Sequence, residues 1–139
     1  MLEKALEWAA RAHAGRIGED GEPEVLHPLR VMLRLLADDE RQVALLHDVI
    51  EDCGVTPEAL QAAGFTDEVV AAVEVLTGRP DESYDDYIAR VAQLPLAARV
   101  KRADVAEHVA VVSRMPVSNA VMLRLGNYRR AGVTLNTAN

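Results

Sequence analysis

The amino-acid sequence predicts an all-α protein that folds as a single domain, residues 1–139. Apolar residues recur at helical spacing along most of the chain, and apolar–polar alternation is nowhere sustained over the length of a strand. Glycine and proline residues separate the helical stretches. A chain of 139 residues is long enough for one domain with a modest hydrophobic core.

The first two helices are expected at residues 2–14 and 27–37. The segment between them, residues 15–24, contains three glycines and a proline, which is typical of a loop. Pro28 fits the first turn of the second helix, because its missing N–H group has no helical partner there in any case. The apolar face expected for this second helix consists of Leu29, Met32, Leu33 and Leu36.

A third helix is expected to run without interruption to Asp52. Asp38 or Asp39 can cap its start, and Gly54 is a stop signal just beyond its end. Capping threonines, prolines and glycines then set the limits of the remaining helices. These are expected at residues 56–64, 66–76, 83–93, 95–112 and 118–131, with a loop at 78–82 and a frayed tail at 134–139.

Composition and charge exclude several classes of protein. No apolar run approaches the length of a membrane span and no basic–apolar leader follows Met1, so a membrane-spanning or secreted protein is not expected. The single cysteine, Cys53, cannot form an internal disulfide, which fits the reducing cytoplasm. A net charge of −7 disfavours a general nucleic-acid surface, although a local cation can still bind a small phosphorylated ligand.

Residues 47–52, with the sequence His-Asp-Val-Ile-Glu-Asp, are the most informative feature of the chain. They follow an apolar helical stretch, where ionisable groups are costly unless they are paired or bind a metal. On a continuous helix, His47 and Glu51 form one row and Asp48 and Asp52 form the next. His27 and Asp104 can approach from two other helices, which predicts a metal site with the ligands His27, His47, Asp48 and Asp104.

This donor set favours a single divalent ion, with Mn as the first choice and Fe or Zn as alternatives to it. Two imidazoles and two carboxylates suit these metals better than Ca or Mg. A lone histidine on an amphipathic helix is usually an ordinary hydrogen-bonded side chain, and a Glu–Asp pair at a helix end is commonly a solvated face. The metal hypothesis therefore depends on the combination of motifs rather than on any one of them.

Several segments together resemble a known family, in the order and spacing that the family shows. They are Ala12-His13-Ala14-Gly15, His27-Pro28-Leu29, residues 44–52, Leu76-Thr77, Val100-Lys101-Arg102-Ala103-Asp104 and Tyr128-Arg129-Arg130-Ala131. Over about residues 4–131 the chain resembles the HD-type hydrolase domain of RelA/SpoT-like proteins, and in particular the small stand-alone (p)ppGpp hydrolases. The resemblance implies an all-helical HD bundle, a bound Mn-type ion and a guanosine-3′,5′-bis(diphosphate) 3′-pyrophosphohydrolase, or a hydrolase of a related nucleotide.

The resemblance also implies roles for individual residues. His27, His47, Asp48 and Asp104 match the family's metal ligands, and Glu51 and Asp52 match the acidic pair beside the attacking water. A carboxylate in that position can accept the proton of the water and later help to protonate the leaving oxygen.

The chain departs from the family pattern at three places around the expected nucleotide site. An Arg–Lys pair of the family aligns with Gly18 and Glu19, an aromatic residue three positions before the metal-binding histidine is Glu24, and an asparagine is His108. These changes predict weaker recognition of guanosine tetraphosphate. The residues left to contact the substrate are Arg16, Lys101, Arg102 and His108.

Two functions remain open at this point. One is a metal-dependent phosphohydrolase acting on a phosphorylated, guanosine-based nucleotide. The other is a catalytically weak or idle HD module that binds nucleotide or keeps a structural metal. The intact pair of Glu51 and Asp52 favours the enzyme, whereas the altered loop favours a changed substrate or a lost activity. The oligomeric state is left open.

Overall fold

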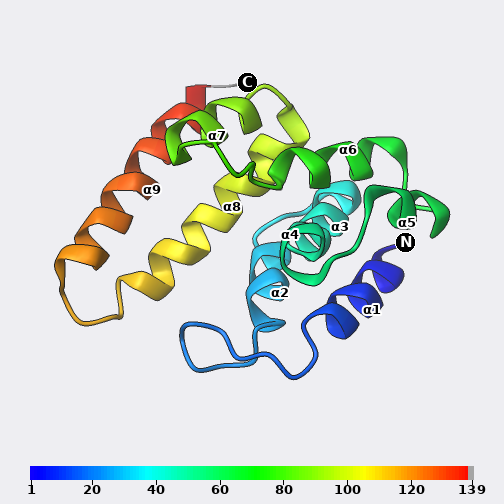
Figure 1. The fold of residues 1–139 in the computed structure, drawn as a ribbon, viewed down its shortest axis with the longest axis horizontal. Helices are drawn as coiled ribbons and strands as arrows, with labels where there is room; N and C mark the ends of the chain where they lie inside the picture. The colour runs from blue at the N-terminus through cyan, green and yellow to red at the C-terminus, as the bar shows by residue number, and fades with distance from the viewer. Residues whose placement is uncertain (138–139) are drawn as a thin grey trace.

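The computed structural model describes residues 1–137, and within this range it contains nine α-helices (Figure 1). An isolated bridge between Ile17 and Pro23 is the only extended pairing in these residues. The helices are α1 (Leu2–Ala12), α2 (Leu26–Leu33), α3 (Asp38–Leu46), α4 (Val49–Cys53), α5 (Pro57–Ala62), α6 (Asp67–Leu76), α7 (Tyr84–Val91), α8 (Pro95–Val112) and α9 (Asn119–Thr137).

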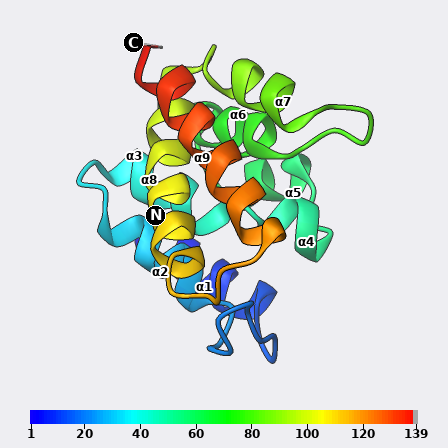
Figure 2. The ribbon, with the colours of Figure 1, turned by 90° about the vertical axis from the view of Figure 1, so that its left-hand side faces the viewer.

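Helix α3 lies at the centre of the bundle and packs against α1, α2, α6 and α8. Its residues 43–46 are fully buried, and they belong to a hydrophobic core to which nearly every helix contributes. Helix α8 runs alongside α9, and α7 packs against both of them (Figure 2). Because α2, α3 and α8 all touch one another, side chains from these three helices can meet at one point inside the bundle.

The helix expected at residues 38–52 is interrupted at His47 and Asp48, which form a turn between α3 and α4. The prediction of one continuous helix was therefore wrong. In an uninterrupted helix the carbonyl of Ala44 would accept the N–H of Asp48, but here the imidazole Nδ1 of His47 lies 2.5 Å from that carbonyl oxygen. A side chain that takes a backbone acceptor competes with the helix, and the break follows from that competition.

The ends of two other helices also differ from the predictions. Helix α2 stops at Leu33, and the expected apolar face fails there because Leu33 and Leu36 are largely exposed. The chain turns after Leu33, and Arg41 binds the carbonyl of Leu35 in that turn. Helix α9 continues to Thr137 because Leu135 is buried in the core, so residues 134–137 are not a frayed tail; residues 138–139 lie outside the described range.

The other element limits agree with the local signals. Gly54 adopts φ +69°, a left-handed conformation that ends α4 as expected. Thr56, Thr66 and Ser83 cap α5, α6 and α7 through side-chain oxygens that accept backbone N–H groups. Within residues 1–137, none of the helices has the length and apolar character that crossing a bilayer requires.

The burial of Leu46, immediately before the His-Asp turn, allows a matched test of the core. Leu46 is 0% exposed and Leu36 is 89% exposed. Replacement of Leu46 by alanine should lower the free energy of unfolding by about 2–5 kcal/mol, because it leaves a cavity at the centre of the bundle. Leu36→Ala should change it by no more than about 0.5 kcal/mol. Urea denaturation of both variants measures the difference, and equal losses would contradict the assigned packing.

Candidate metal centre

The buried carboxylate of Asp104, on α8, is the centre of the site. Its Oδ1 atom lies 2.8 Å from Nε2 of His27, 3.4 Å from Nε2 of His47 and 3.3 Å from Nε2 of His108. Its Oδ2 atom accepts a hydrogen bond from Nζ of Lys101 at 2.8 Å. Three imidazoles from three different helical segments thus converge on one carboxylate oxygen.

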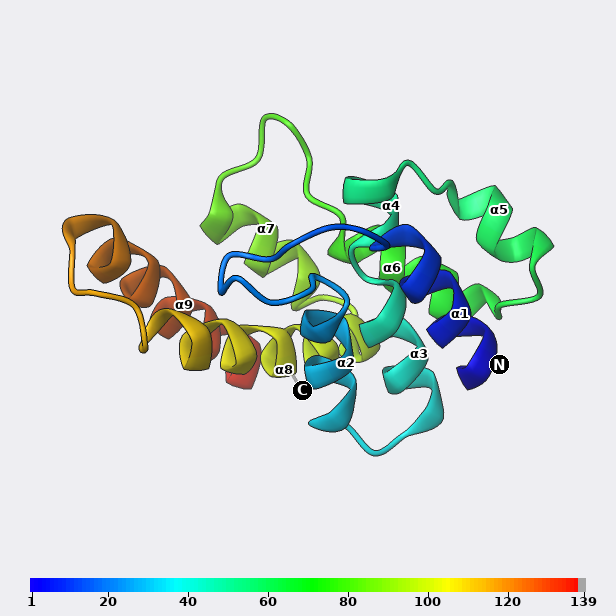
Figure 3. The same cartoon turned by 90° about the horizontal axis from the view of Figure 1, so that it is seen from below.

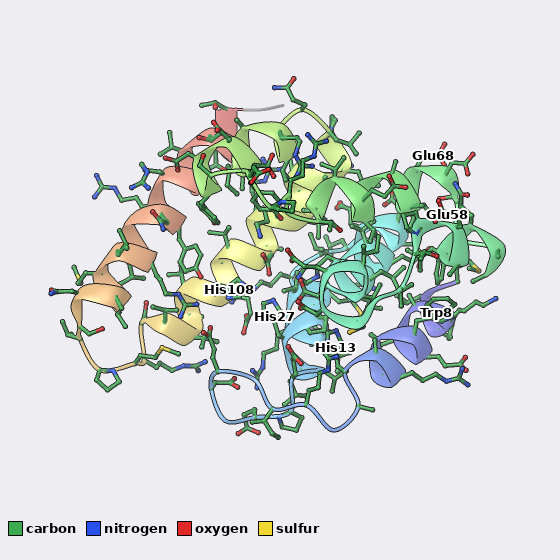
Figure 4. The ribbon with its side chains drawn as sticks, viewed as in Figure 1. Trp8, His13, His27, Glu58, Glu68 and His108 are labelled. Carbon is green, nitrogen blue, oxygen red and sulfur yellow. The ribbon has the colours of Figure 1, made fainter. Side chains whose placement is uncertain are left out.

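Local structure explains why these side chains meet. His27 lies in the first turn of α2, and His47 is held at the end of α3 by its contact with Ala44. That contact leaves Nε2 of His47 facing Asp104 and Oδ2 of Asp48, which is 3.2 Å away. Figure 4 shows His27 and His108 facing each other between α2 and α8. The structure therefore places the four predicted ligands in one cluster, and it adds His108 to them.

The electrostatics of the cluster indicate that it is built for a cation. Burial raises the pKa of Asp104, but Lys101 and the hydrogen bonds of the three imidazoles outweigh it and hold the pKa well below its ordinary value. Burial likewise lowers the pKa of His47, but Asp48 and Asp104 outweigh it and raise the pKa. The two aspartates are thus kept ionised, and a metal bound here would replace the proton that they stabilise on His47.

The donor atoms are close enough to share an ion. One atom each from His27, His47 and Asp48 lie within 4.8 Å of one another, and the same is true of His27, Asp104 and His108. Two ligands about 2.1 Å from an ion and at right angles to each other are about 3 Å apart, as the atoms around Oδ1 of Asp104 are. The residues present therefore fit a divalent metal.

The acidic pair after the His-Asp turn is divided between two hollows. Asp52 lines a pocket of about 330 Å³ together with His27 and Asp48. Glu51 lines a neighbouring hollow with Lys101, and its carboxylate faces the backbone of Gly78. Burial, followed by repulsion from nearby carboxylates, raises the pKa values of both acids. Both can hold a proton more readily than an isolated carboxylate.

The pocket beside the cluster is strongly acidic. Its walls come from the loop between α1 and α2, from α2, from the α3–α4 turn and from α8. Arg30 is the one arginine in that lining, and it is paired with Asp20 at 3.1 Å. The acidic lining residues are Glu19, Asp20, Glu24, Asp48 and Asp52.

The predicted substrate-binding cations are not gathered in this pocket. Arg16 donates to the carbonyl of Asp52 from a separate groove beside α1. Lys101 is committed to Asp104 and packs over the ring of Tyr87. Arg102 donates to the carbonyl of Leu135 on α9, so the structure does not bring it to the site. Among the predicted substrate contacts, His108 alone lines the pocket.

Two residues of α9 near the pocket were not predicted as site residues: Arg124 was not singled out in the sequence, and Tyr128 was noted only as part of a family motif. Arg124 makes a two-pronged ion pair with Glu19, at 2.9 and 3.1 Å, and also donates to the hydroxyl of Tyr128. The ring of Tyr128 in turn stacks on His108, with centroids 5.6 Å apart. Figure 3 shows the loop between α1 and α2 reaching toward α8 and α9. The sequence signal that could have identified this pair is the four-residue spacing of Arg124 and Tyr128, which places both side chains on one face of a helix.

Comparison with known proteins finds relatives named as guanosine-3′,5′-bis(diphosphate) 3′-pyrophosphohydrolases and as GTP pyrophosphokinases. A segment of 66 residues is 49% identical to a guanosine-3′,5′-bis(diphosphate) 3′-pyrophosphohydrolase of Vibrio cholerae, covering 44% of this chain and 9% of that protein. Over 120 residues the chain is 31% identical to a protein of the same name from Aquifex aeolicus, covering 78% and 17%. A GTP pyrophosphokinase of Myxococcus xanthus is 38% identical over 81 residues, covering 55% and 11%.

The chain spans less than a fifth of the length of these curated relatives. No protein-family model matches it. A solved structure, described as a metazoan ortholog of SpoT that hydrolyses ppGpp, superimposes with a TM-score of 0.82 at 21% identity, over 99% of this chain and 86% of that one. This similarity confirms the all-α HD bundle that the sequence predicted.

The cluster predicts one divalent ion per chain. Free Mn²⁺ at 100 times its dissociation constant should stabilise the folded protein by about 2.7 kcal/mol, because the unfolded chain has no assembled site. Asp48→Ala should abolish this gain, whereas Asp81→Ala, an exposed loop carboxylate, should retain it. Thermal unfolding with and without Mn²⁺, together with elemental analysis, measures both effects. Equal metal content in the two variants would rule out this ligand assignment.

Proposed function

Because the chain is an HD-type, RelA/SpoT-like relative of guanosine-3′,5′-bis(diphosphate) 3′-pyrophosphohydrolases, we propose that it is a metal-dependent phosphohydrolase. The proposed substrate is a guanosine nucleotide with a 3′-diphosphate, or a closely related nucleotide. The observation that carries the proposal is the convergence of His27 and His47 on Asp104, with Asp48 against His47, at the edge of a pocket that Asp52 also lines.

In this proposal His27, His47, Asp48 and Asp104 hold the ion. A divalent metal there supplies Lewis acidity toward phosphoryl oxygens and lowers the pKa of water. Mn²⁺ is the first choice, with Fe²⁺ and Zn²⁺ as alternatives, because the set mixes imidazoles with carboxylates. Lys101 holds Oδ2 of Asp104, which keeps Oδ1 directed at the three imidazoles.

Asp52 and Glu51 carry the proton transfers. Asp52 faces the pocket, where its carboxylate can take a proton from an attacking water. Glu51 lines the neighbouring hollow with Lys101, and if it starts in its protonated form it can give that proton to the leaving oxygen. The raised pKa values suit both steps, because a higher pKa makes Asp52 a stronger base and favours the protonated form of Glu51.

The acidic pocket supports a second, weaker hypothesis about the function of the same site. Carboxylates dominate its lining, and Arg124 is occupied by Glu19 instead of being open to a phosphate. A nucleotide with four phosphates would be repelled unless the metal and a freed arginine compensate. We therefore propose weak binding of guanosine tetraphosphate, and an idle nucleotide- or metal-binding module is the alternative. The single Cys53, which cannot form an internal disulfide, supports a cytoplasmic location.

The proton-transfer roles predict large kinetic effects from small changes. Glu51→Gln and Asp52→Asn each keep the shape of the side chain and remove its charge. Each should lower kcat for hydrolysis of guanosine tetraphosphate by about 10²–10⁴-fold while the protein still binds Mn²⁺. Release of pyrophosphate in steady-state assays measures the rate, and equilibrium dialysis measures the metal.

Glu58→Gln is the matched control, since it makes the same change on the exposed surface of α5, away from His27 and His108 (Figure 4). It should leave kcat unchanged. If both active-site variants turn over substrate at the parental rate, the pair has no part in catalysis. If the unmodified, Mn-loaded protein hydrolyses no nucleotide of a phosphorylated panel, the idle-module alternative takes the place of the enzyme.

Substrate recognition should improve when a cation is added to the pocket. Gly18 lines the pocket, and an added Cβ there lies 3.3 Å from Oδ1 of Asp20, so Gly18→Arg requires the Asp20 side chain to shift by a few tenths of an ångström. The KM for guanosine tetraphosphate should fall by more than kcat rises, because the new charge adds binding that substrate and transition state share. Gly132→Arg on α9, with open space around it, is the control. A parental KM already in the low micromolar range would contradict weak recognition.

A further inference from the structure

Two of the positions at which the chain departs from the family pattern contact each other. Glu19, in the loop between α1 and α2, faces His108 on α8, and Oε1 of Glu19 lies 3.8 Å from Nδ1 of His108. Both residues line the pocket beside the metal cluster. Their contact suggests that the two departures form one local arrangement.

The ring of His108 is held in a defined orientation. It packs against the ring of His27 with centroids 4.5 Å apart, and it stacks on Tyr128 at 5.6 Å with only 13° between the planes. Asp104 lies one helical turn before it, so the two side chains share one face of α8. The result is that Nε2 of His108 faces Oδ1 of Asp104 at 3.3 Å.

The two ring nitrogens of His108 have the surroundings that a metal-binding imidazole usually has. Such a histidine directs one nitrogen at the metal and donates its other N–H to a carboxylate or a backbone carbonyl. His47 follows this pattern, with Nδ1 on the carbonyl of Ala44 and Nε2 on the aspartates. His108 approaches it, with Nε2 3.3 Å from Asp104 and Nδ1 3.8 Å from Glu19, a charge contact longer than a hydrogen bond that a small shift of the Glu19 side chain would close.

Glu19 is itself held in place from the other side. Arg124 binds both of its carboxylate oxygens, at 2.9 and 3.1 Å. This pairing is the main reason that the pKa of Glu19 is lowered, so the carboxylate stays ionised next to the imidazole. Arg124, Glu19 and His108 thus form a chain of contacts that ends at the oxygen shared by His27 and His47.

We propose that His108 is a further protein ligand of the divalent metal, and that Glu19 orients it. The inference rests on the proposed function, because it concerns the same ion. Together with His27, His47, Asp48 and Asp104 it makes a set of three imidazoles and two carboxylates. A third histidine ligand favours the binding of Fe²⁺, Co²⁺ and Zn²⁺ over that of Mg²⁺ and Ca²⁺. His108 would also occupy a coordination position that water or substrate would otherwise fill. Glu19 would then orient a metal ligand and would not contact the nucleotide.

Cobalt binding tests the proposal without any assay of activity. Co²⁺ is titrated into the parent and into His108→Asn, and the visible absorption of the bound ion and its dissociation constant are recorded. Loss of one imidazole should change the absorption bands and weaken binding by at least the roughly 10–100-fold typical of a lost outer partner. Circular dichroism confirms that the variant is folded.

Glu19→Gln tests the orienting role, with Glu22→Gln as the matched control in the same loop. Glu22 is exposed and does not line the pocket beside the cluster. We expect Glu19→Gln to weaken Co²⁺ binding by about 10–100-fold and Glu22→Gln to leave it unchanged. Equal affinities in the two variants would overturn the role given to Glu19.

Proton NMR of the Co²⁺ protein counts the imidazoles directly. Each bound histidine with an N–H group should give one exchangeable, strongly shifted resonance, so the parent should show three and His108→Asn two. Two resonances in both proteins, with unchanged absorption bands, would overturn the proposal and leave the metal site and the proposed function intact. A parent that binds no Co²⁺ would overturn both. Retained Co²⁺ affinity with a raised KM in His108→Asn would make His108 a nucleotide contact instead.

Discussion

The arrangement of this protein depends on how the buried charge of Asp104 is compensated. A carboxylate that is almost completely buried is costly unless several partners surround it. Lys101 occupies one of its oxygens, and imidazoles from α2, α3 and α8 surround the other. The packing of α3 against both α2 and α8 brings these partners into reach. Compensation of one charge therefore links the three helices, and a bound divalent ion would strengthen the link.

The break between α3 and α4 serves the same end. Because His47 uses the carbonyl of Ala44, its other nitrogen is turned toward the aspartates, and Asp48 lies in a turn rather than within a continuous helix. Of the eleven residues that line the pocket beside it, five are acidic and one is an arginine. Such a surface attracts cations and repels polyphosphates. The site is thus well suited to hold a metal, whereas the proposed nucleotide substrate would have to bind against unfavourable electrostatics.

The sequence was sufficient for the fold class, most helix positions and the grouping of the four predicted metal ligands, because periodicity, caps and motif spacing are local signals. It did not predict the interruption at His47, since that depends on a side-chain contact with Ala44. It also placed the end of α9 too early, because the burial of Leu135 is decided by tertiary packing. Arg102 was predicted to contact the substrate, but it donates to the carbonyl of Leu135 on α9 instead. Tertiary packing decides which face of α8 lies against α9, and the local sequence does not show this.

Diffraction from crystals grown with Mn²⁺, recorded at the manganese absorption edge, is the most direct test of the metal centre. We expect a single strong anomalous peak bonded to Oδ1 of Asp104. The same peak should be within ligand distance of the Nε2 atoms of His27 and His47 and of a carboxylate oxygen of Asp48. Mn²⁺ bound instead among the outer carboxylates of the pocket, or no peak beside Asp104 at saturating Mn²⁺, would contradict the assignment of this cluster as the metal centre.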